Sequence, residues 1–161
     1  MNDTPTLRLS TPEPLAMIRV VVAPSEMPRI VAPALQELVT VLAAQQVRPR
    51  GAWLTYHFRR PTDTFDVAIC MPVAQPVAPM GRVQPGELPA VPVACTTHYG
   101  PYDELRAAWK ALSDWIVAQG HTAAADRWER YVTGPDSLLA PSLWRTELSQ
   151  PLRDAHTPRT G

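Results

Sequence analysis

The chain has 161 residues, enough for one compact domain whose hydrophobic core needs no help from disulfides or metals. Apolar residues make up 45% of it, and 15 basic side chains balance 15 acidic ones, so no net charge or basic tract supports nucleic-acid binding. No apolar run approaches the length of a membrane span, and the amino terminus lacks a hydrophobic signal core. We therefore expect a cytoplasmic protein.

The first half of the chain shows one helical pattern among β-rich segments. Residues 1–12 are polar and are expected to form a flexible tail before a first half-unit at about 13–73. Within that half-unit the predicted elements are a strand at 16–22, a helix at 33–46, and strands at 52–58 and 65–71. Pro33 is expected in the first turn of the helix, because a proline in a helix interior breaks the hydrogen-bond ladder.

A proline-rich stretch at 74–86 is interpreted as a linker to a second half-unit at 87–153. The predicted elements there are a strand at 91–98, a helix from about 101 to 119, and strands at 128–132 and 143–148. Gly100 and Pro101 mark the start of this helix and Gly120 its end. Residues 154–161 are expected to form a flexible tail.

The two half-units match each other when the sequence is compared with itself. An offset of 74 positions places the first helical pattern on the second, and an offset of 75 places Trp53 on Trp128 and Tyr56 on Tyr131. Few matches are identities, but their order along the two halves is the same. This collinearity indicates a duplicated strand–helix–strand–strand unit.

The duplication predicts an α+β fold in one domain spanning residues 13–153. Two such units can pair their sheets about a pseudo-twofold axis and give an antiparallel-rich sheet. The helices would then cover one face of the sheet, and a central ligand groove would lie between the halves on the other face.

A short segment of the second half, Trp-Glu-Arg-Tyr, is the most suggestive of binding. Side chains alternate along a strand, so Glu129 and Tyr131 share one face. The offset of 75 puts Glu129 where the first half has Leu54, which suggests a carboxylate that faces inward. Beside aromatic rings, such a carboxylate suits a cationic or hydrogen-bonding apolar ligand. The alternative is an exposed glutamate on an edge strand, paired with Arg127 or Arg145.

Other candidate residues surround the second helix. Trp109 lies in its apolar stripe and is either a pocket wall or a core residue, while Tyr102 lies near the turn at the helix mouth. If the protein is an enzyme, Glu129 is its acid or base beside the hydroxyl of Tyr131. The histidines and cysteines have no metal-like spacing, and no phosphate-binding loop is present, so we expect no metal and no cofactor.

Several of these segments together resemble the GyrI-like family. Residues 98–105, His-Tyr-Gly-Pro-Tyr-Asp-Glu-Leu, are similar to the helix entry in the second half of that family. Glu129-Arg130-Tyr131 resembles its Glu-x-Tyr strand, and residues 65–73 resemble its strand that ends in Pro-Val. Thr146 with Pro151-Leu152 resembles its closing strand. The resemblance runs from about residue 9 to residue 153.

The resemblance implies the duplicated fold and a central pocket for hydrophobic, often cationic or drug-like compounds. The family's ligand-contacting acid corresponds to Glu129, and Trp109, Tyr56, Tyr131 and Tyr102 are the implied aromatic walls. Many family members are the carboxy-terminal sensor of a transcription activator. Here only a short tail precedes the first strand, so no helix-turn-helix fits, and we expect no direct binding to nucleic acid and none to membranes.

Three functions follow from these expectations. The first is a stand-alone small-molecule-binding protein that senses an effector or sequesters it. The second is a hydrolase, because some free-standing proteins that resemble the family hydrolyse reactive cyclopropane-bearing compounds with a pocket glutamate and an aromatic residue. The third is a protein-interaction module resembling a topoisomerase inhibitor. The sequence leaves the ligand, any protein partner and the oligomeric state open.

Overall fold

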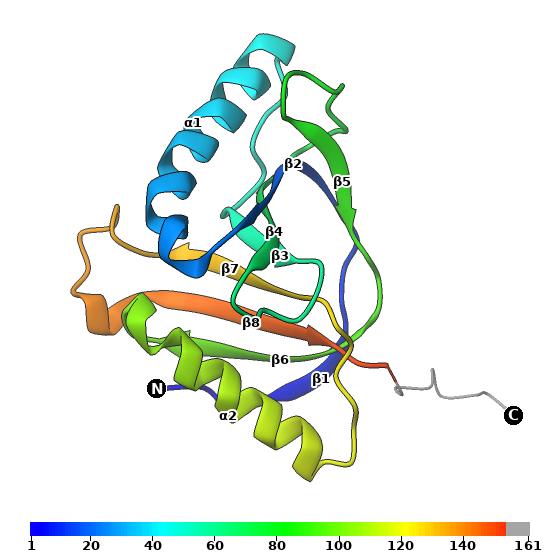
Figure 1. Ribbon diagram of the computed structural model, residues 1–161, viewed down its shortest axis with the longest axis vertical. Helices are drawn as coiled ribbons and strands as arrows, with labels where there is room; N and C mark the ends of the chain where they lie inside the picture. Colours follow the sequence, from blue (N-terminus) through cyan, green and yellow to red (C-terminus); the bar gives the residue numbers. More distant parts are fainter. Residues whose placement is uncertain (154–161) are drawn as a thin grey trace, which may run out of the picture. The chain divides into compact units, whose positions relative to one another are not determined.

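The computed structural model describes residues 1–153 (Figure 1). The fold is α+β, and the described residues form eight strands and two α-helices, with short 3-10 turns between them. They divide into two compact units: unit 1 contains Met1–Ser10 and the chain from Ala90 onward, and unit 2 is Thr11–Pro89. The tail expected at 154–161 lies outside the described residues.

Unit 2 consists of an antiparallel sheet and one helix. Its elements are β2 (Glu13–Val22), a 3-10 turn (Pro24–Glu26), α1 (Met27–Gln45), β3 (Leu54–His57), β4 (Phe65–Pro72) and β5 (Gln84–Leu88). The strands lie in the order β3-β4-β2-β5.

Unit 1 repeats this plan. Its elements are β1 (Thr6–Leu9), β6 (Pro92–Tyr99), a 3-10 turn (Tyr102–Glu104), α2 (Leu105–Ala118), β7 (Arg127–Thr133), a 3-10 turn (Pro141–Leu143) and β8 (Arg145–Pro151). The strands lie in the order β7-β8-β6-β1, again antiparallel. Each unit is therefore a strand–helix–strand–strand element with one extra edge strand, which confirms the predicted duplication.

The extra edge strands are where the sequence analysis was wrong. Thr6–Leu9 was assigned to a flexible tail, but β1 pairs with β6 along its whole length. The stretch 74–86 was assigned to a linker, but Val77 and Val83 are buried in the core of unit 2, and β5 begins at Gln84. Both strands are short and mostly exposed, so neither shows the apolar alternation by which a strand is recognised in sequence.

Helix α1 packs one side on its own sheet. Ala34, Leu38 and Leu42 recur at helical spacing and are buried against Ile18 and Ile69 of the strands. The stretch Pro24–Gln45 is long and apolar enough to cross a membrane by length and composition alone, which the sequence analysis did not anticipate. Packing on the sheet accounts for its apolar side, as in the core helix of a globular domain.

The prediction that Pro33 lies in the first turn of α1 was wrong. The helix begins at Met27, and Pro33 lies inside it on the exposed side. A proline there leaves the carbonyl of Arg29 without its helical N–H partner. Because this side faces solvent, water can bond to that carbonyl, and the helix continues.

Helix α2 covers one face of the sheet of unit 1 (Figure 1). Its apolar stripe is buried against the inward side chains of the strands, among them Ala94 and Leu148. The residues of the stripe are Leu105, Ala108, Trp109, Leu112 and Ile116. Gly120 follows the helix with φ of 79°, a left-handed conformation that glycine adopts without strain, so the predicted end of the helix is confirmed.

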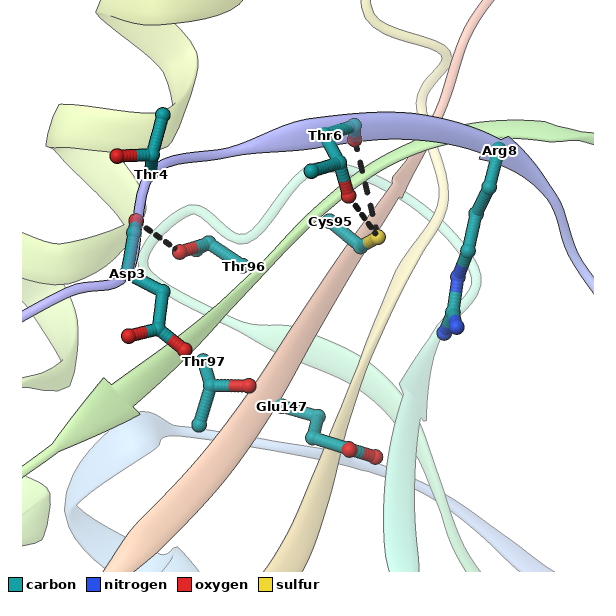
Figure 2. Close-up of a pocket in the computed structure, with 8 residues that line it drawn as sticks. All are labelled: Asp3, Thr4, Thr6, Arg8, Cys95, Thr96, Thr97 and Glu147. Atoms are coloured by element: carbon teal, nitrogen blue, oxygen red, sulfur yellow. Dashed lines mark hydrogen bonds between the residues drawn. The ribbon is translucent and has the colours of Figure 1, made fainter.

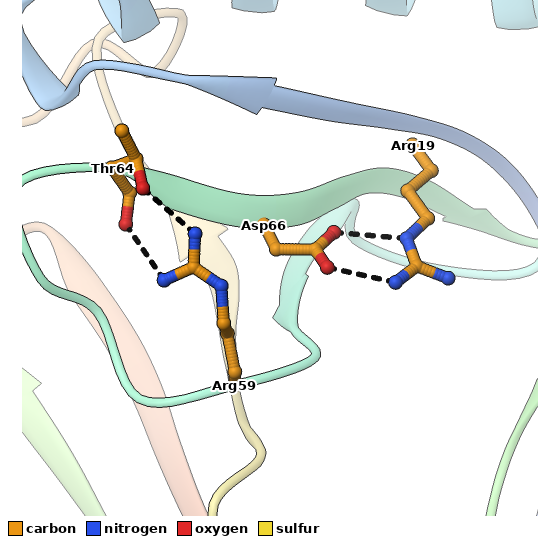
Figure 3. A network of polar contacts seen from close by, with 4 residues as sticks. All are labelled: Arg19, Arg59, Thr64 and Asp66. Atoms are coloured by element: carbon orange, nitrogen blue, oxygen red, sulfur yellow. Dashed lines mark hydrogen bonds and ion pairs between the residues drawn. The ribbon is translucent and has the colours of Figure 1, made fainter.

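A polar network on unit 2 fixes the turn between β3 and β4 (Figure 3). Arg59 donates to the carbonyl and to the hydroxyl of Thr64, at 3.2 and 2.7 Å. Arg19 forms two hydrogen bonds with the carboxylate of Asp66, at 2.9 and 2.8 Å, and its guanidinium lies 3.9 Å from the ring centroid of Phe58. The side-chain hydrogen bond from Arg19 lowers the pKa of Asp66. Arg59 and Thr64 belong to the turn, whereas Arg19 and Asp66 join β2 to β4, and none of the four was predicted as a site residue.

Candidate functional site

Strand β7 places Glu129 and Tyr131 under helix α2. Glu129 lies opposite Leu148 and Tyr131 opposite Thr146 on the neighbouring strand, and Leu148 packs in the core beneath the helix. The ladder between β7 and β8 shifts after Tyr131, where β7 carries one extra residue. Such a bulge turns the strand just beyond the two side chains.

The carboxylate of Glu129 is bound by two neutral donors. The indole Nε1 of Trp109 on α2 donates to Oε1, and the hydroxyl of Tyr131 donates to Oε2 at 2.5 Å. Glu129 is 9% exposed and Trp109 4% exposed. Hydrogen bonds from neutral groups hold a carboxylate in place without supplying a counter-charge. The alternative prediction, an exposed glutamate paired with Arg127 or Arg145, is wrong because Glu129 is buried.

Tyr102 adds a ring to this group. Its centroid lies 5.4 Å from that of Tyr131 and 5.3 Å from that of Trp144, the first at an edge-on angle of 63° and the second at 50°. Burial raises the pKa of Tyr102, and the charges of Asp136 and Glu129 act in the same direction. The phenol therefore stays neutral to a higher pH than an ordinary tyrosine. We call Trp109, Glu129, Tyr131, Tyr102 and Trp144 the Glu129 cluster.

Arg127 lies beside this cluster. Its guanidinium is 4.1 Å from the centroid of the Trp109 ring, within the range of a cation–π interaction. It lies two positions before Glu129 on β7, so the two side chains share one face of the sheet.

The helix entry explains how Tyr102 reaches the cluster. Gly100 has φ of 148°, and a Cβ there would meet the Oε1 atom of Glu104 at 2.1 Å and the Nε2 atom of His98 at 2.9 Å. Only glycine therefore leaves room for Glu104 to reach back to His98, whose Nε2 lies 3.2 Å from that carboxylate. The turn that follows begins at Tyr102 and directs its ring toward β7.

His98 ties this entry to the amino-terminal segment. Its side chain is 5% exposed, and its Nδ1 lies 2.6 Å from the side-chain oxygen of Asn2. Burial and the nearby positive amino terminus lower its pKa, against an opposing effect of Glu104. The neutral form is therefore favoured, as expected of a hydrogen-bonded polar residue at a strand end.

The side-chain hydroxyl of Thr146, on the strand next to Tyr131, has no hydrogen-bond partner among the described residues. Its side chain is fully buried, opposite Tyr131 on one neighbouring strand and His98 on the other. Among residues 1–153 no group is placed to hydrogen-bond with its Oγ1. A buried hydroxyl without a partner is uncommon, because its desolvation is not compensated.

The sequence alignment of the two halves was wrong by one residue at β3 and β7. In unit 2, Thr55 lies opposite Ile69, which packs under α1, so Thr55 and not Leu54 occupies the position that corresponds to Glu129. A shift of one residue moves every side chain of a strand to the other face. Tyr56 accordingly lies on the face opposite α1, where its ring contacts that of Phe58 at 5.0 Å.

The structure thus brings together Glu129, Trp109, Tyr131 and Tyr102 and leaves Tyr56 in the other unit. The four meet on the helix-covered face of unit 1, whereas the sequence analysis placed the ligand groove on the opposite face. Two neighbours were missed. Trp144 directly follows a proline-containing turn, at the start of the strand predicted at 143–148, and was not considered as a site residue, while Arg127 was considered only as a partner of an exposed glutamate.

A polar hollow lies on the other face of unit 1 (Figure 2). Its volume is about 220 Å³, and it is lined by Asp3, Thr4, Thr6, Arg8, Cys95, Thr96, Thr97 and Glu147. Internal hydrogen bonds already join part of this lining, for example from Thr96 to the carbonyl of Asp3 at 2.6 Å. Ligand pockets usually measure about 300–1,000 Å³ and are mostly apolar, so the Glu129 cluster is the better candidate.

No group of three or more histidine, cysteine, aspartate or glutamate side chains is placed to hold a metal ion in the part of the chain that the structure describes. The chemistry that the Glu129 cluster offers is therefore that of its own side chains: a positioned carboxylate, a phenol hydroxyl and several ring faces.

Comparisons with known proteins agree with this architecture. The model of the family described as GyrI-like small molecule binding domain matches residues 4–153. A search of curated proteins found no match.

Solved structures give the same fold. The C-terminal domain of EcmrR is 21% identical with a TM-score of 0.82, and the match covers 93% of this chain and 97% of that one. EcmrR in its complex with DNA is 23% identical with a TM-score of 0.81, but the match covers only 57% of that chain. This chain thus spans little more than half the length of that EcmrR chain. SAV2435 bound to tetraphenylphosphonium is 10% identical with a TM-score of 0.64, and the match covers 94% of this chain and 95% of that one.

Proposed function

The chain belongs to the GyrI-like small-molecule-binding family, and from this premise we propose that it captures a hydrophobic, drug-like compound in the cytoplasm. Capture either reports the compound to a partner or sequesters it. The contact residues in this proposal are Glu129, Trp109, Tyr131 and Tyr102. Tyr56 stays a prediction of the sequence analysis and is not needed for the proposed site.

One observation supports this proposal above the others: a buried carboxylate is held between an indole N–H and a phenol hydroxyl. Removing a carboxylate from water is costly, and a purely structural core would be more stable with an apolar residue there. The ring faces beside it suit the apolar body of a ligand, and the carboxylate suits a donor or a charge on that body. A neighbour of the same fold binds tetraphenylphosphonium, an aromatic cation of this kind.

Ligand-induced stabilisation tests the proposal. A compound that binds the folded state raises Tm by mass action, by an amount equivalent to about 2.7 kcal/mol at a hundred times Kd. The probes are tetraphenylphosphonium, with four phenyl rings and a positive charge, and the neutral triphenylphosphine oxide, with three phenyl rings and an oxide oxygen. We expect at least one of them to raise the Tm of the wild-type protein and to give a saturable titration by calorimetry.

The variant Glu129→Gln assigns that binding to the cluster. Glutamine keeps the shape of the side chain but removes the charge and one acceptor, so we expect a loss of about tenfold or more in affinity for tetraphenylphosphonium. Glu147→Gln is the matched control, because Glu147 lies on the neighbouring strand with its side chain on the other face, 3.6 Å from Arg130. Equal losses in both variants would refute the assignment.

Two other results would replace the proposal. If Glu129→Gln keeps its affinity for a reactive cyclopropane-bearing compound that only the wild-type protein hydrolyses, the protein is a hydrolase. If neither probe binds the wild-type protein, the small-molecule proposal fails and the protein-interaction alternative takes its place.

A further inference from the structure

Arg127 gives the Glu129 cluster a positive charge of its own. Its guanidinium lies 4.1 Å from the centroid of the Trp109 ring, and its side chain is half-buried. Tryptophan is the aromatic side chain that attracts a cation most strongly, and a cation within about 6 Å of the ring centroid benefits from that attraction. The preferred place for a cation in this cluster is therefore already taken by a residue of the chain.

Other side chains of the protein cover the remaining surface of Trp109. The residue is 4% exposed, its ring packs in the core beneath α2, and its N–H edge donates to Glu129. A ligand cation that approached the indole face would have to displace Arg127. A neutral aromatic ligand can instead use Tyr102, Tyr131 and Trp144 without that displacement.

The charge of Arg127 acts on a ligand through space too. Arg127 and Glu129 are two residues apart on one strand, which places their backbone positions roughly 7 Å from each other. Both charged groups contact Trp109, the carboxylate at its N–H edge and the guanidinium over its ring, so the two opposite charges partly compensate each other. A ligand cation that is attracted by Glu129 is repelled by Arg127, whereas a neutral ligand is indifferent to the pair.

We propose that Arg127 is a specificity-determining residue that turns the Glu129 cluster toward neutral aromatic ligands and against lipophilic cations. This inference rests on the proposed function, since it concerns the ligand of the same site. The proposed role belongs to Arg127 alone on this strand, because the side chain of Arg130 lies on the opposite face, 3.6 Å from Glu147.

Three variants separate charge from packing. Arg127→Met keeps a long apolar side chain over the ring but removes the charge, and Arg127→Lys keeps the charge. Arg130→Met makes the same change in net charge on the other face of β7. A merely structural Arg127 would affect stability in Arg127→Met without altering the choice between ligands.

The measurement is the ratio of the Kd values for tetraphenylphosphonium and triphenylphosphine oxide, by calorimetry on each folded variant. We expect Arg127→Met to shift this ratio toward the cation by about tenfold, the scale of a partly desolvated cation–π interaction. Arg127→Lys and Arg130→Met are expected to keep the wild-type ratio. Arg127→Gln replaces Arg127→Met if circular dichroism shows that the methionine variant does not fold.

The outcomes distinguish the two proposals. If tetraphenylphosphonium binds in a Glu129-dependent way and removal of the Arg127 charge leaves the ratio unchanged, the specificity role is refuted and the proposed function stands. An equal shift in Arg130→Met refutes it too, because the effect is then one of net charge. If neither probe binds the wild-type protein or any variant, the proposed function fails and this inference fails with it.

Discussion

The unpartnered hydroxyl of Thr146 gives a sharp test of the packing beneath α2. Thr146→Val replaces the hydroxyl by a methyl group of nearly the same size, so the change removes a buried polar atom and leaves the shape of the core. Thr96→Val makes the same replacement on the neighbouring strand β6, where the hydroxyl donates to the carbonyl of Asp3 at 2.6 Å. Both threonines are buried, with 0% and 6% of their surface exposed.

The two substitutions are expected to change stability in opposite directions. At position 146 no hydrogen bond is lost and the desolvation penalty of an unsatisfied hydroxyl, about 1–3 kcal/mol, is removed. At position 96 a hydrogen bond with a net value of about 0.5–1.5 kcal/mol is lost. We therefore expect the free energy of unfolding to rise by about 1 kcal/mol in Thr146→Val and to fall by about 1 kcal/mol in Thr96→Val.

Urea denaturation followed by circular dichroism measures both changes, provided that the slope of the transition stays constant. In a chain of this size a change of 1 kcal/mol corresponds to a shift in Tm of about 2–4 °C, which calorimetry can confirm. If Thr146→Val is destabilised as much as Thr96→Val, the hydroxyl of Thr146 has a hydrogen-bond partner in solution and the reasoning is refuted.

Two further predictions concern the entry to α2. In Gly134→Ala the new Cβ would lie 2.2 Å from the hydroxyl of Tyr102, so we expect the ring of Tyr102 to move. The near-UV circular dichroism should then change, and the affinity for the probes should fall several-fold. Gly51→Ala is the control, because its Cβ meets nothing within 4 Å, and it should change none of these. The pKa of His98 is lower in the folded protein than in the unfolded chain, so the unfolded chain binds a proton first as the pH falls below 6.5. The contribution of His98 to stability is therefore full above that pH and is lost below it. Denaturation at a series of pH values should show this loss in the wild-type protein and a smaller one in His98→Gln; equal losses would refute the assignment.

Much of the fold could be predicted because the helices carry strong patterns. The apolar stripe of α2 and the glycines at its two ends defined that helix, and the offset of 74 positions aligned it correctly with α1. The strands β1 and β5 could not be found in the same way. They are exposed edge strands held by backbone pairing, and backbone hydrogen bonds leave no periodic trace in the sequence.

The alignment of the strands failed because it relied on identical residues. Matching Trp53 with Trp128 required an offset of 75, yet Trp53 packs under α1 whereas Trp128 lies on the face away from α2. The offset of the helices, 74, gives the pairing seen in the structure, with Trp53 equivalent to Arg127. In a duplicated fold, a constant offset between helix and following strand is therefore a better guide than one shared aromatic residue.

The main residues of the candidate site were predicted to lie together, but the site was assigned to the wrong face of the sheet. Alternation along a strand was enough to place Glu129 and Tyr131 together, and helical spacing was enough to place Trp109 inward. The face of the sheet that these residues share depends on how α2 crosses the strands. The distances between the helix and the strands cannot be read from a single sequence. For the same reason the contact of Arg127 with Trp109 was not foreseen.

The corrected equivalence also shows where the two units differ in the polar side chains under their helices. At the positions of Glu129 and Tyr131, unit 2 has Thr55 and His57, and at the position of Trp109 it has Leu35. The sister unit therefore offers neither a buried carboxylate nor an indole donor at these places, although its helix and strands are built on the same plan. The scaffold alone does not require these groups, and this difference between the units supports the binding role proposed for the polar side chains under α2.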